Sequence, residues 1–224
     1  FVGAVTLAIG TNPGGGALSG TASVTAEAGV ARFTGLSIDK SGTGYTLTAS
    51  ATGPSGATSA AFDITAGAPS QLVFTQQPSP GPVVAGATMS PAVTVAVQDV
   101  HGNLVATASG AVTLALTGAP VGVTLTGGGE AAVTNGVATF GALSVNKVGT
   151  YTLTPTTNVA GVTTLPASSN FAVSAGAASQ LVFTRQPSPV VAGASMSPAV
   201  TVAVADLYDN TVTTASGTVT LALT

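Results

Sequence analysis

The chain has 224 residues, only 5% of them charged, and a formal net charge of −3. It therefore has no basic surface that would attract phosphates, and we expect no nucleic-acid binding. The mean hydropathy is +0.57, yet Thr, Ser and Gly interrupt every apolar run before it reaches the roughly 20 residues of a membrane helix. We expect no membrane span, and with no Cys the compartment is not indicated by disulfides.

The sequence repeats itself at one period. VVAGATMSPAVTVAVQD at 83–99 returns as VVAGASMSPAVTVAVAD at 190–206, and AVTLAI at 4–9 recurs at 111–116 and, as TVTLAL, at 218–223. Val5, Val112 and Val219 are therefore 107 positions apart. Self-similarity of this kind is typical of an array in which each repeat is one structural module.

The apolar residues of one repeat alternate as in half-buried strands. Val93, Val95 and Val97 are separated by single small residues, while Gly and Pro clusters such as PSPGP at 78–82 punctuate the strands. From Gln71 onward, strands are predicted near 71–76, 91–98, 110–117, 123–134 with a break, 136–145, 150–156 and 168–174. The inward parity switches beside Gly141, and likewise beside Gly35, so we expect a β-bulge at each glycine.

Seven short strands per repeat predict an all-β fold of tandem immunoglobulin-like β-sandwiches. The division is the C-terminal half of one repeat (1–66), a complete repeat (67–175) and the N-terminal half of a third (176–224). Because the linkers 66–70 and 175–179 are short, we expect the modules to stack as an extended rod. We expect the chain to be a section of a longer repetitive polypeptide, since 1–9 and 215–223 would be redundant copies of one strand. Strand exchange between successive molecules is the alternative.

Three patterns together resemble bacterial Ig-like repeats of the invasin, intimin and large-adhesin type. They are QLVFTxQPSP at the start of a repeat, VxDxxxNxV after its second strand, and GVARFTGLSIDKSGTGYTLT at 29–48 with its counterpart at 136–154. The resemblance implies a long extracellular or cell-surface protein in which such modules form stalks, adhesive tips, fibres or sheaths. Sandwiches of this kind host many unrelated functions, so the resemblance specifies the fold better than the activity.

The recurring polar residues are best interpreted as structural. Asp99 and Asp206 recur in turn sequences, and we assign them to turn chemistry; a Ca²⁺ site is the alternative, although the loops supply too few of the six to eight oxygens that Ca²⁺ takes. His101 is replaced by Tyr208 in the next repeat and is expected to be an exposed turn residue. Lys40 and Lys147 also recur, and we expect each to be a solvated turn residue, with a contact between neighbouring chains as the alternative. Tyr45 and Tyr151 are expected to form a tyrosine corner.

No constellation for catalysis is visible. Glu27, Asp63 and Glu130 have no acidic counterparts in the neighbouring repeat, and no base stands beside a nucleophile. We therefore expect no enzyme activity and no catalytic, cofactor-binding or metal-binding residues.

Outward strand positions carry Thr, Ala and Ser in place of charges, which favours packing against copies of the same chain. The first hypothesis is a self-associating structural section of a surface fibre, sheath or adhesin with, at most, a cell-surface or glycan ligand. The alternatives are a passive stalk and a carbohydrate-binding module, which few aromatics and no Trp disfavour.

Overall fold

The computed structural model describes residues 3–79 and 81–222. The extreme ends of the predicted segments 1–66 and 176–224, Pro80 of the turn at 78–82, and the end of the strand predicted at 218–223 lie outside the described residues. All regular structure in the described part is β, which confirms the predicted fold class. Those residues form no helix long and apolar enough to cross a membrane.

The chain forms two compact units. Unit 1 comprises Phe1–Gln71, Val97–Ala108 and Ala160–Thr164, and unit 2 comprises Leu72–Ala96, Ser109–Val159 and Leu165–Thr224. Each unit therefore combines segments from more than one sequence repeat. The predicted boundaries at 66 and 175, and the predicted stacking of modules into a rod, stay predictions.

Unit 1 contains the antiparallel sheet β3-β1-β6-β7 and two short pairs, β2–β4 and β5–β8. Alternation of apolar and small residues makes the strands one-sided, as in β1, where every second residue is half-buried and the others are exposed. Tyr45 on β5 is fully buried and stacks beside Phe62 of β8. The strands are β1 (Ala4–Ile9), β2 (Leu18–Ser19), β3 (Ser23–Thr25), β4 (Ser37–Ile38), β5 (Gly42–Tyr45), β6 (Leu47–Ala51), β7 (Ala57–Thr58) and β8 (Phe62–Ile64).

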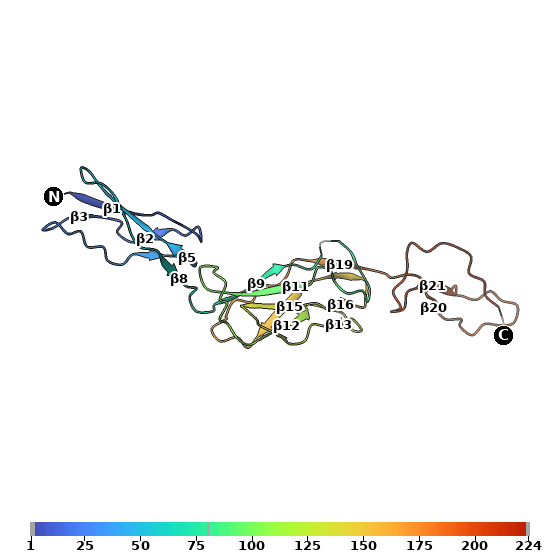
Figure 1. The fold of residues 1–224 in the computed structure, drawn as a ribbon. Helices are drawn as coiled ribbons and strands as arrows, with labels where there is room; N and C mark the ends of the chain where they lie inside the picture. Colours follow the sequence, from blue (N-terminus) through green and yellow to red (C-terminus); the bar gives the residue numbers. More distant parts are fainter. Residues whose placement is uncertain (1–2, 80, 223–224) are drawn as a thin grey trace. The chain divides into compact units, whose positions relative to one another are not determined.

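Unit 2 contains a two-layer sandwich (Figure 1). One layer is β9-β11-β15. The other has the order β10-β19-β17 and continues past the single residue Thr152 into β18-β12-β14. The strands are β9 (Gln71–Gln76) and β11 (Val93–Gln98), which extend into unit 1, and β10 (Val83–Val84), β12 (Ala111–Leu116), β13 (Leu125–Thr126), β14 (Ala131–Ala132), β15 (Val137–Phe140), β16 (Ser144–Val145), β17 (Gly149–Tyr151), β18 (Leu153–Thr157) and β19 (Phe171–Ser174).

The core of unit 2 lies between these layers, and the predicted inward residues fill it. Val93 and Val95 of β11 have no exposed surface, and neither has Val112 of β12 nor Leu153 of β18. The residues that alternate with them lie on the other side of each sheet, as the period of two requires, although Ala96 of β11 is also covered, with only 1% exposed. The sandwich is therefore immunoglobulin-like, with β10 pairing parallel to β19 at its edge.

The parity switch at Gly141 has a different cause from the bulge that the sequence predicts. β15 ends at Phe140 after pairing with β11, and β16 begins at Ser144 and pairs with β13. Three residues stand between them, of which Gly141 and Ala142 form a turn and Leu143 is buried. The strand therefore breaks and changes partner, which redirects the inward side chains without an extra residue in one ladder.

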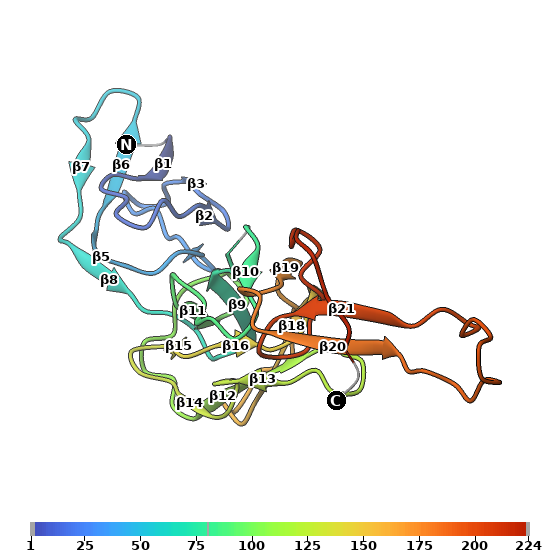
Figure 2. The ribbon, with the colours of Figure 1, turned by 90° about the vertical axis from the view of Figure 1, so that its right-hand side faces the viewer.

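The last strands of unit 2, β20 (Gln180–Arg185) and β21 (Thr201–Ala205), form an antiparallel pair (Figure 2). They repeat the sequence of β9 and β11. Their register runs from Gln180 opposite Ala205 to Arg185 opposite Thr201, with an irregularity between Phe183 and Arg185. No third strand joins this pair among the residues described.

Candidate functional site: the junction between repeats

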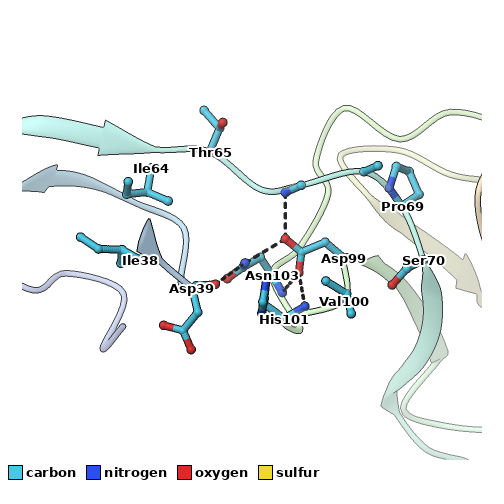
Figure 3. Close-up of a pocket in the computed structure, with 12 residues that line it drawn as sticks. Ile38, Asp39, Ile64, Thr65, Pro69, Ser70, Asp99, Val100, His101 and Asn103 are labelled. Carbon is cyan, nitrogen blue, oxygen red and sulfur yellow. Dashed lines mark hydrogen bonds between the residues drawn. The ribbon is translucent and has the colours of Figure 1, made fainter. Parts of the chain in front are cut away.

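The most organised polar site of unit 1 lies where the linker after β8 meets the turn that follows β11 (Figure 3). The turn Asp99–Asn103 is closed by Asn103 N–H donating to Asp99 Oδ1 at 2.9 Å and by Asp99 N–H donating to Asn103 O at 3.0 Å. Gly102 provides the left-handed residue, with φ +78°. The turn belongs to the middle sequence repeat, and it contacts the linker at Gly67 and the first repeat at residues 39–41.

Asp99 is a buried carboxylate surrounded by N–H donors. Its Oδ1 accepts from the backbone N–H groups of His101 and Asn103, each at 2.9 Å. Its Oδ2 accepts from Gly67 N–H at 2.8 Å and from Asn103 Nδ2 at 2.9 Å. Gly67 lies in the linker between the two repeats, so this side chain ties the linker to the turn. The turn role predicted for Asp99 is confirmed, and the linker contact extends it.

Asn103 connects the turn to the preceding repeat. Its Oδ1 accepts from Ser41 N–H, and its Nδ2 donates to Asp39 O, both at 2.9 Å. Only 8% of Asn103 is exposed. A buried amide whose donor and acceptor are both used specifies one orientation, because any other orientation leaves buried groups unpaired.

Lys40 adds a third connection. Its Nζ donates a hydrogen bond to the carbonyl oxygen of His101, at the tip of the turn. The carbonyl oxygen of Lys40 in turn accepts from the hydroxyl of buried Tyr45 at 2.9 Å. The tyrosine corner predicted at Tyr45 is therefore confirmed. Tyr45 thereby holds the backbone of Lys40, whose amine contacts the next repeat. The sequence predicted a solvated turn lysine or a contact between neighbouring chains, and neither includes this contact within one chain.

Unit 2 holds the same network, with its aspartate, asparagine and lysine each 107 residues later in the sequence. Asp206 accepts from Tyr208 N–H at 2.9 Å, Asn210 N–H at 3.0 Å and Gly176 N–H at 2.8 Å. Asn210 Oδ1 accepts from Val148 N–H at 3.0 Å, and its Nδ2 donates to Asn146 O at 2.9 Å. The corresponding lysine and tyrosine contacts are Lys147 Nζ to Tyr208 O and Tyr151 hydroxyl to Lys147 O. We call each network, one per unit, the junction clasp.

The electrostatics of the clasp favour an ionised aspartate. Burial by itself raises the pKa of Asp99, but hydrogen bonds from the Asn103 side chain and from the Gly67, Asn103 and His101 backbones outweigh it and lower the pKa from 3.8 to about 2. Burial and the equivalent donors act on Asp206, whose pKa also falls to about 2. Both carboxylates are committed to N–H donors that a protonated acid would satisfy less well.

An open cavity of about 450 Å³ lies beside the clasp of unit 1. Ile38 and Ile64 form its apolar side, and Asp39 and His101 lie at its polar side (Figure 3). Asp39 Oδ1 accepts from Ala17 N–H at 2.7 Å, and this hydrogen bond lowers the pKa of Asp39. The side chain of His101 is exposed, as the sequence predicts.

The remaining acidic residues considered from sequence do not meet. Glu27, Asp63 and Glu130 are all exposed, and Asp63 accepts from Gly44 N–H at 2.9 Å. Within residues 3–79 and 81–222, no three His, Cys, Asp or Glu side chains gather where they could hold one metal ion. Sequence reasoning missed the bridging role of Asn103 and Asn210. The available signal was that Lys, Asp and Asn recur together, with the Lys-to-turn spacing of 61 in both cases.

No family model matches this chain, and no curated protein does. Among solved structures, the chain is similar to the Escherichia coli adhesin FdeC at 20% identity and a TM-score of 0.40, covering 91% of this chain and 62% of that one. A β-glycosidase from Bacteroides vulgatus matches at 14% identity and a TM-score of 0.34, over 76% of this chain and 21% of the enzyme. A chimeric titin Z1Z2 tandem matches at 16% identity and a TM-score of 0.28, over 79% and 85%. At these values we base no argument on the three likenesses.

Proposed function

We propose that this chain is a non-enzymatic structural section of a long extracellular protein, a surface fibre, sheath or adhesin, whose copies associate side by side. The observation that carries the proposal is the junction clasp, which occurs twice with the same donors and acceptors. Its aspartate, asparagine and lysine connect one repeat to the next, and its tyrosine holds the backbone of that lysine. Polar residues that recur for this purpose support a role in holding an array together.

The outward sheet faces support self-association. β1, β6, β12 and β18 contain no charged residue. On the outer side of β12 and β18, Thr113 lies opposite Thr156 and Ala115 lies opposite Thr154. Soluble proteins normally place charges on such positions, which keep sheets of different molecules apart. A face of small uncharged residues lets a second sheet approach closely.

The two alternatives have weaker support. A passive stalk needs the junction clasp but has no use for uncharged faces. A carbohydrate-binding module needs exposed aromatic rings, whereas the aromatic pairs Tyr45–Phe62 and Tyr151–Phe171 pack inside the units. The extracellular location rests on the resemblance of the repeat motifs to bacterial surface proteins. Any cell-surface or glycan ligand would then be bound elsewhere in the assembled protein.

Electron microscopy of the concentrated chain tests lateral association, with a pair of matched variants. Thr113→Lys with Thr156→Lys places two positive charges on the outer face of β12 and β18. Thr75→Lys with Thr94→Lys places the same charges on the other layer, where the two hydroxyls are 2.8 Å apart. At low salt, where charges act over about 30 Å, we expect ordered side-by-side bundles from the wild type and the second variant, and separate threads from the first. Separate threads from the wild type would refute lateral association and favour the stalk. Bundles from the first variant would exclude this face.

A further inference from the structure

Both lysines of the chain stand in a junction clasp. The sequence of 224 residues contains Lys40, Lys147 and no third lysine. Each lysine donates through Nζ to a main-chain oxygen of the turn in the next repeat, that of His101 in unit 1 and that of Tyr208 in unit 2. Both lysine side chains are half-buried. Lysine therefore occurs in this chain only where one repeat meets the next.

The peptide bond that follows Lys147 is held on both sides. The carbonyl oxygen of Lys147 accepts from the Tyr151 hydroxyl at 3.1 Å, and the N–H of Val148 donates to Asn210 Oδ1 at 3.0 Å. The backbone bends at Lys147, in the short connection between β16 and β17. The lysine amine, its carbonyl oxygen and the following N–H are thus all committed to partners within unit 2.

The Lys40–Ser41 bond of unit 1 is held in the same way. The carbonyl oxygen of Lys40 accepts from the Tyr45 hydroxyl, and the N–H of Ser41 donates to Asn103 Oδ1, both at 2.9 Å. The backbone also bends at Lys40. Because the three contacts recur at a second joint, they belong to the joint and are not a peculiarity of one loop.

The three committed groups are those that a lysine-directed serine endopeptidase must bind. Such an enzyme takes the lysine side chain into an acidic pocket, places the carbonyl oxygen of the same residue in its oxyanion hole, and protonates the nitrogen of the leaving amine. Proteolysis follows the exposure and hydrogen bonding of the backbone. Cleavage after Lys147 therefore requires Tyr208 and Asn210 to move away from it, which is the opening of the joint.

We propose that the Lys40–Ser41 and Lys147–Val148 bonds are latent cleavage sites for a lysine-directed serine endopeptidase, and that each junction clasp gates its own site. When the turn of the next repeat withdraws, all three groups of the site are released together. Hydrolysis breaks the bond between the carbonyl carbon of Lys147 and the nitrogen of Val148. Water supplies the hydroxyl group that the carbon gains and the proton that the nitrogen gains.

The position of the cut determines its effect. Hydrolysis after Lys147 separates β16 from β17, so the covalent chain is interrupted inside the middle repeat, beside a joint that has already opened. A closed joint keeps its bond intact. This inference goes beyond the proposed function, because it concerns the hydrolysis of single joints and does not require copies of the chain to associate.

Limited digestion of the whole chain, followed by mass spectrometry, tests the gate. The probe is an endopeptidase that cleaves after lysine and spares arginine, at low concentration, so that the rate follows the population of the open joint. Asp206→Asn leaves two donors of its clasp facing another donor. Cleavage after Lys147 should then accelerate roughly 30-fold or more, whereas cleavage after Lys40 in the same digest keeps its rate. Asp99→Asn is the matched variant and should give the reverse pattern.

Val93→Ala distinguishes the opening of the joint from the unfolding of the sandwich. Val93 of β11 is fully buried, and none of the hydrogen bonds of the clasp in unit 2 involves it. Its truncation should lower the urea midpoint of unit 2 but leave cleavage after Lys147 within about threefold of the wild-type rate. Acceleration as large as that from Asp206→Asn would assign cleavage to unfolding of the sandwich and overturn the proposal. An unchanged rate after Lys147 in Asp206→Asn would also overturn it.

Discussion

The junction clasp of unit 1 predicts a large local effect of Asp99→Asn. The carboxylate accepts from four N–H donors, two at each oxygen, at 2.8–2.9 Å. An amide of the same shape offers one oxygen and one NH₂ group, so two donors face another donor. Leaving a buried donor unpaired costs about 1–3 kcal/mol. Taking the lower half of that range, about 1–2 kcal/mol, for each of the two donors, the free energy of opening the clasp falls by about 2–4 kcal/mol. Amide exchange there then accelerates roughly 30- to 700-fold.

Hydrogen exchange resolved by residue measures this change. The backbone amides of Gly67, His101 and Asn103 should exchange faster, since all three donate to Asp99. Gly176 and Tyr208 donate to Asp206 in unit 2 and serve as internal references that keep their rates. Asp63→Asn is the control variant, because Asp63 is exposed and accepts one backbone hydrogen bond. Rates at Gly67 and Asn103 within about threefold of the wild type would show that the carboxylate does not hold the linker.

Three further predictions follow from the same contacts. Acid should loosen both clasps: the pKa values of Asp99 and Asp206 fall from 3.8 to about 2, so their stabilisation is complete above about pH 4 and is lost as the pH falls towards 2. Each ionised aspartate contributes at most about 2 kcal/mol of this stabilisation, and less where water screens its charge. Amide exchange at the clasps that does not change between pH 4 and pH 2 would contradict the prediction. Gly86→Ala should destabilise unit 2 more than Gly193→Ala in urea unfolding. Both glycines have a positive φ, which costs an alanine about 1–2 kcal/mol. Only at Gly86 would the new Cβ also lie 2.3 Å from the Tyr208 ring. The double variant Gly86→Ala with Tyr208→Ala should therefore remove the difference between the two glycine positions. Tyr151→Phe should lower the free energy of unfolding of unit 2 by about 1 kcal/mol, because the hydroxyl shares its one proton between Lys147 O at 3.1 Å and Val148 O at 3.2 Å. Equal urea midpoints for variant and wild type would refute this prediction.

The strands that the sequence predicts well are those whose side chains alternate. β9 has the predicted bounds 71–76, and β11 and β12 end within two residues of theirs, because valines and leucines face one way and Thr or Ala the other. β10 was missed, since it has two residues and its parallel pairing with β19 depends on a segment 90 positions away. The change of partner after Phe140 was also missed, because a parity switch in sequence does not distinguish a bulge from a broken strand.

The site was predictable in part. The turn role of Asp99 and the tyrosine corner of Tyr45 follow from local sequence, since their partners lie within five positions. The bond from Ser41 N–H to Asn103 spans 62 positions and involves a backbone donor, which leaves no mark on residue type. In the sequence, the only indication of this contact is that Lys40 and the turn recur together, 61 positions apart. That spacing does not reveal a contact until the two segments are seen side by side in three dimensions.

The lysine contact has a consequence for how the joints vary. Lys40 and Lys147 each bond to a main-chain oxygen, that of His101 in one unit and of Tyr208 in the other. The lysine therefore makes no hydrogen bond to the side chain of residue 101 or 208. These two side chains differ in their surroundings: His101 is exposed, whereas Tyr208 is half-buried, and its ring occupies the space that a Cβ on Gly86 would need. Because the lysine contacts only the main chain, the residue at this position can differ from one repeat to the next without loss of that hydrogen bond.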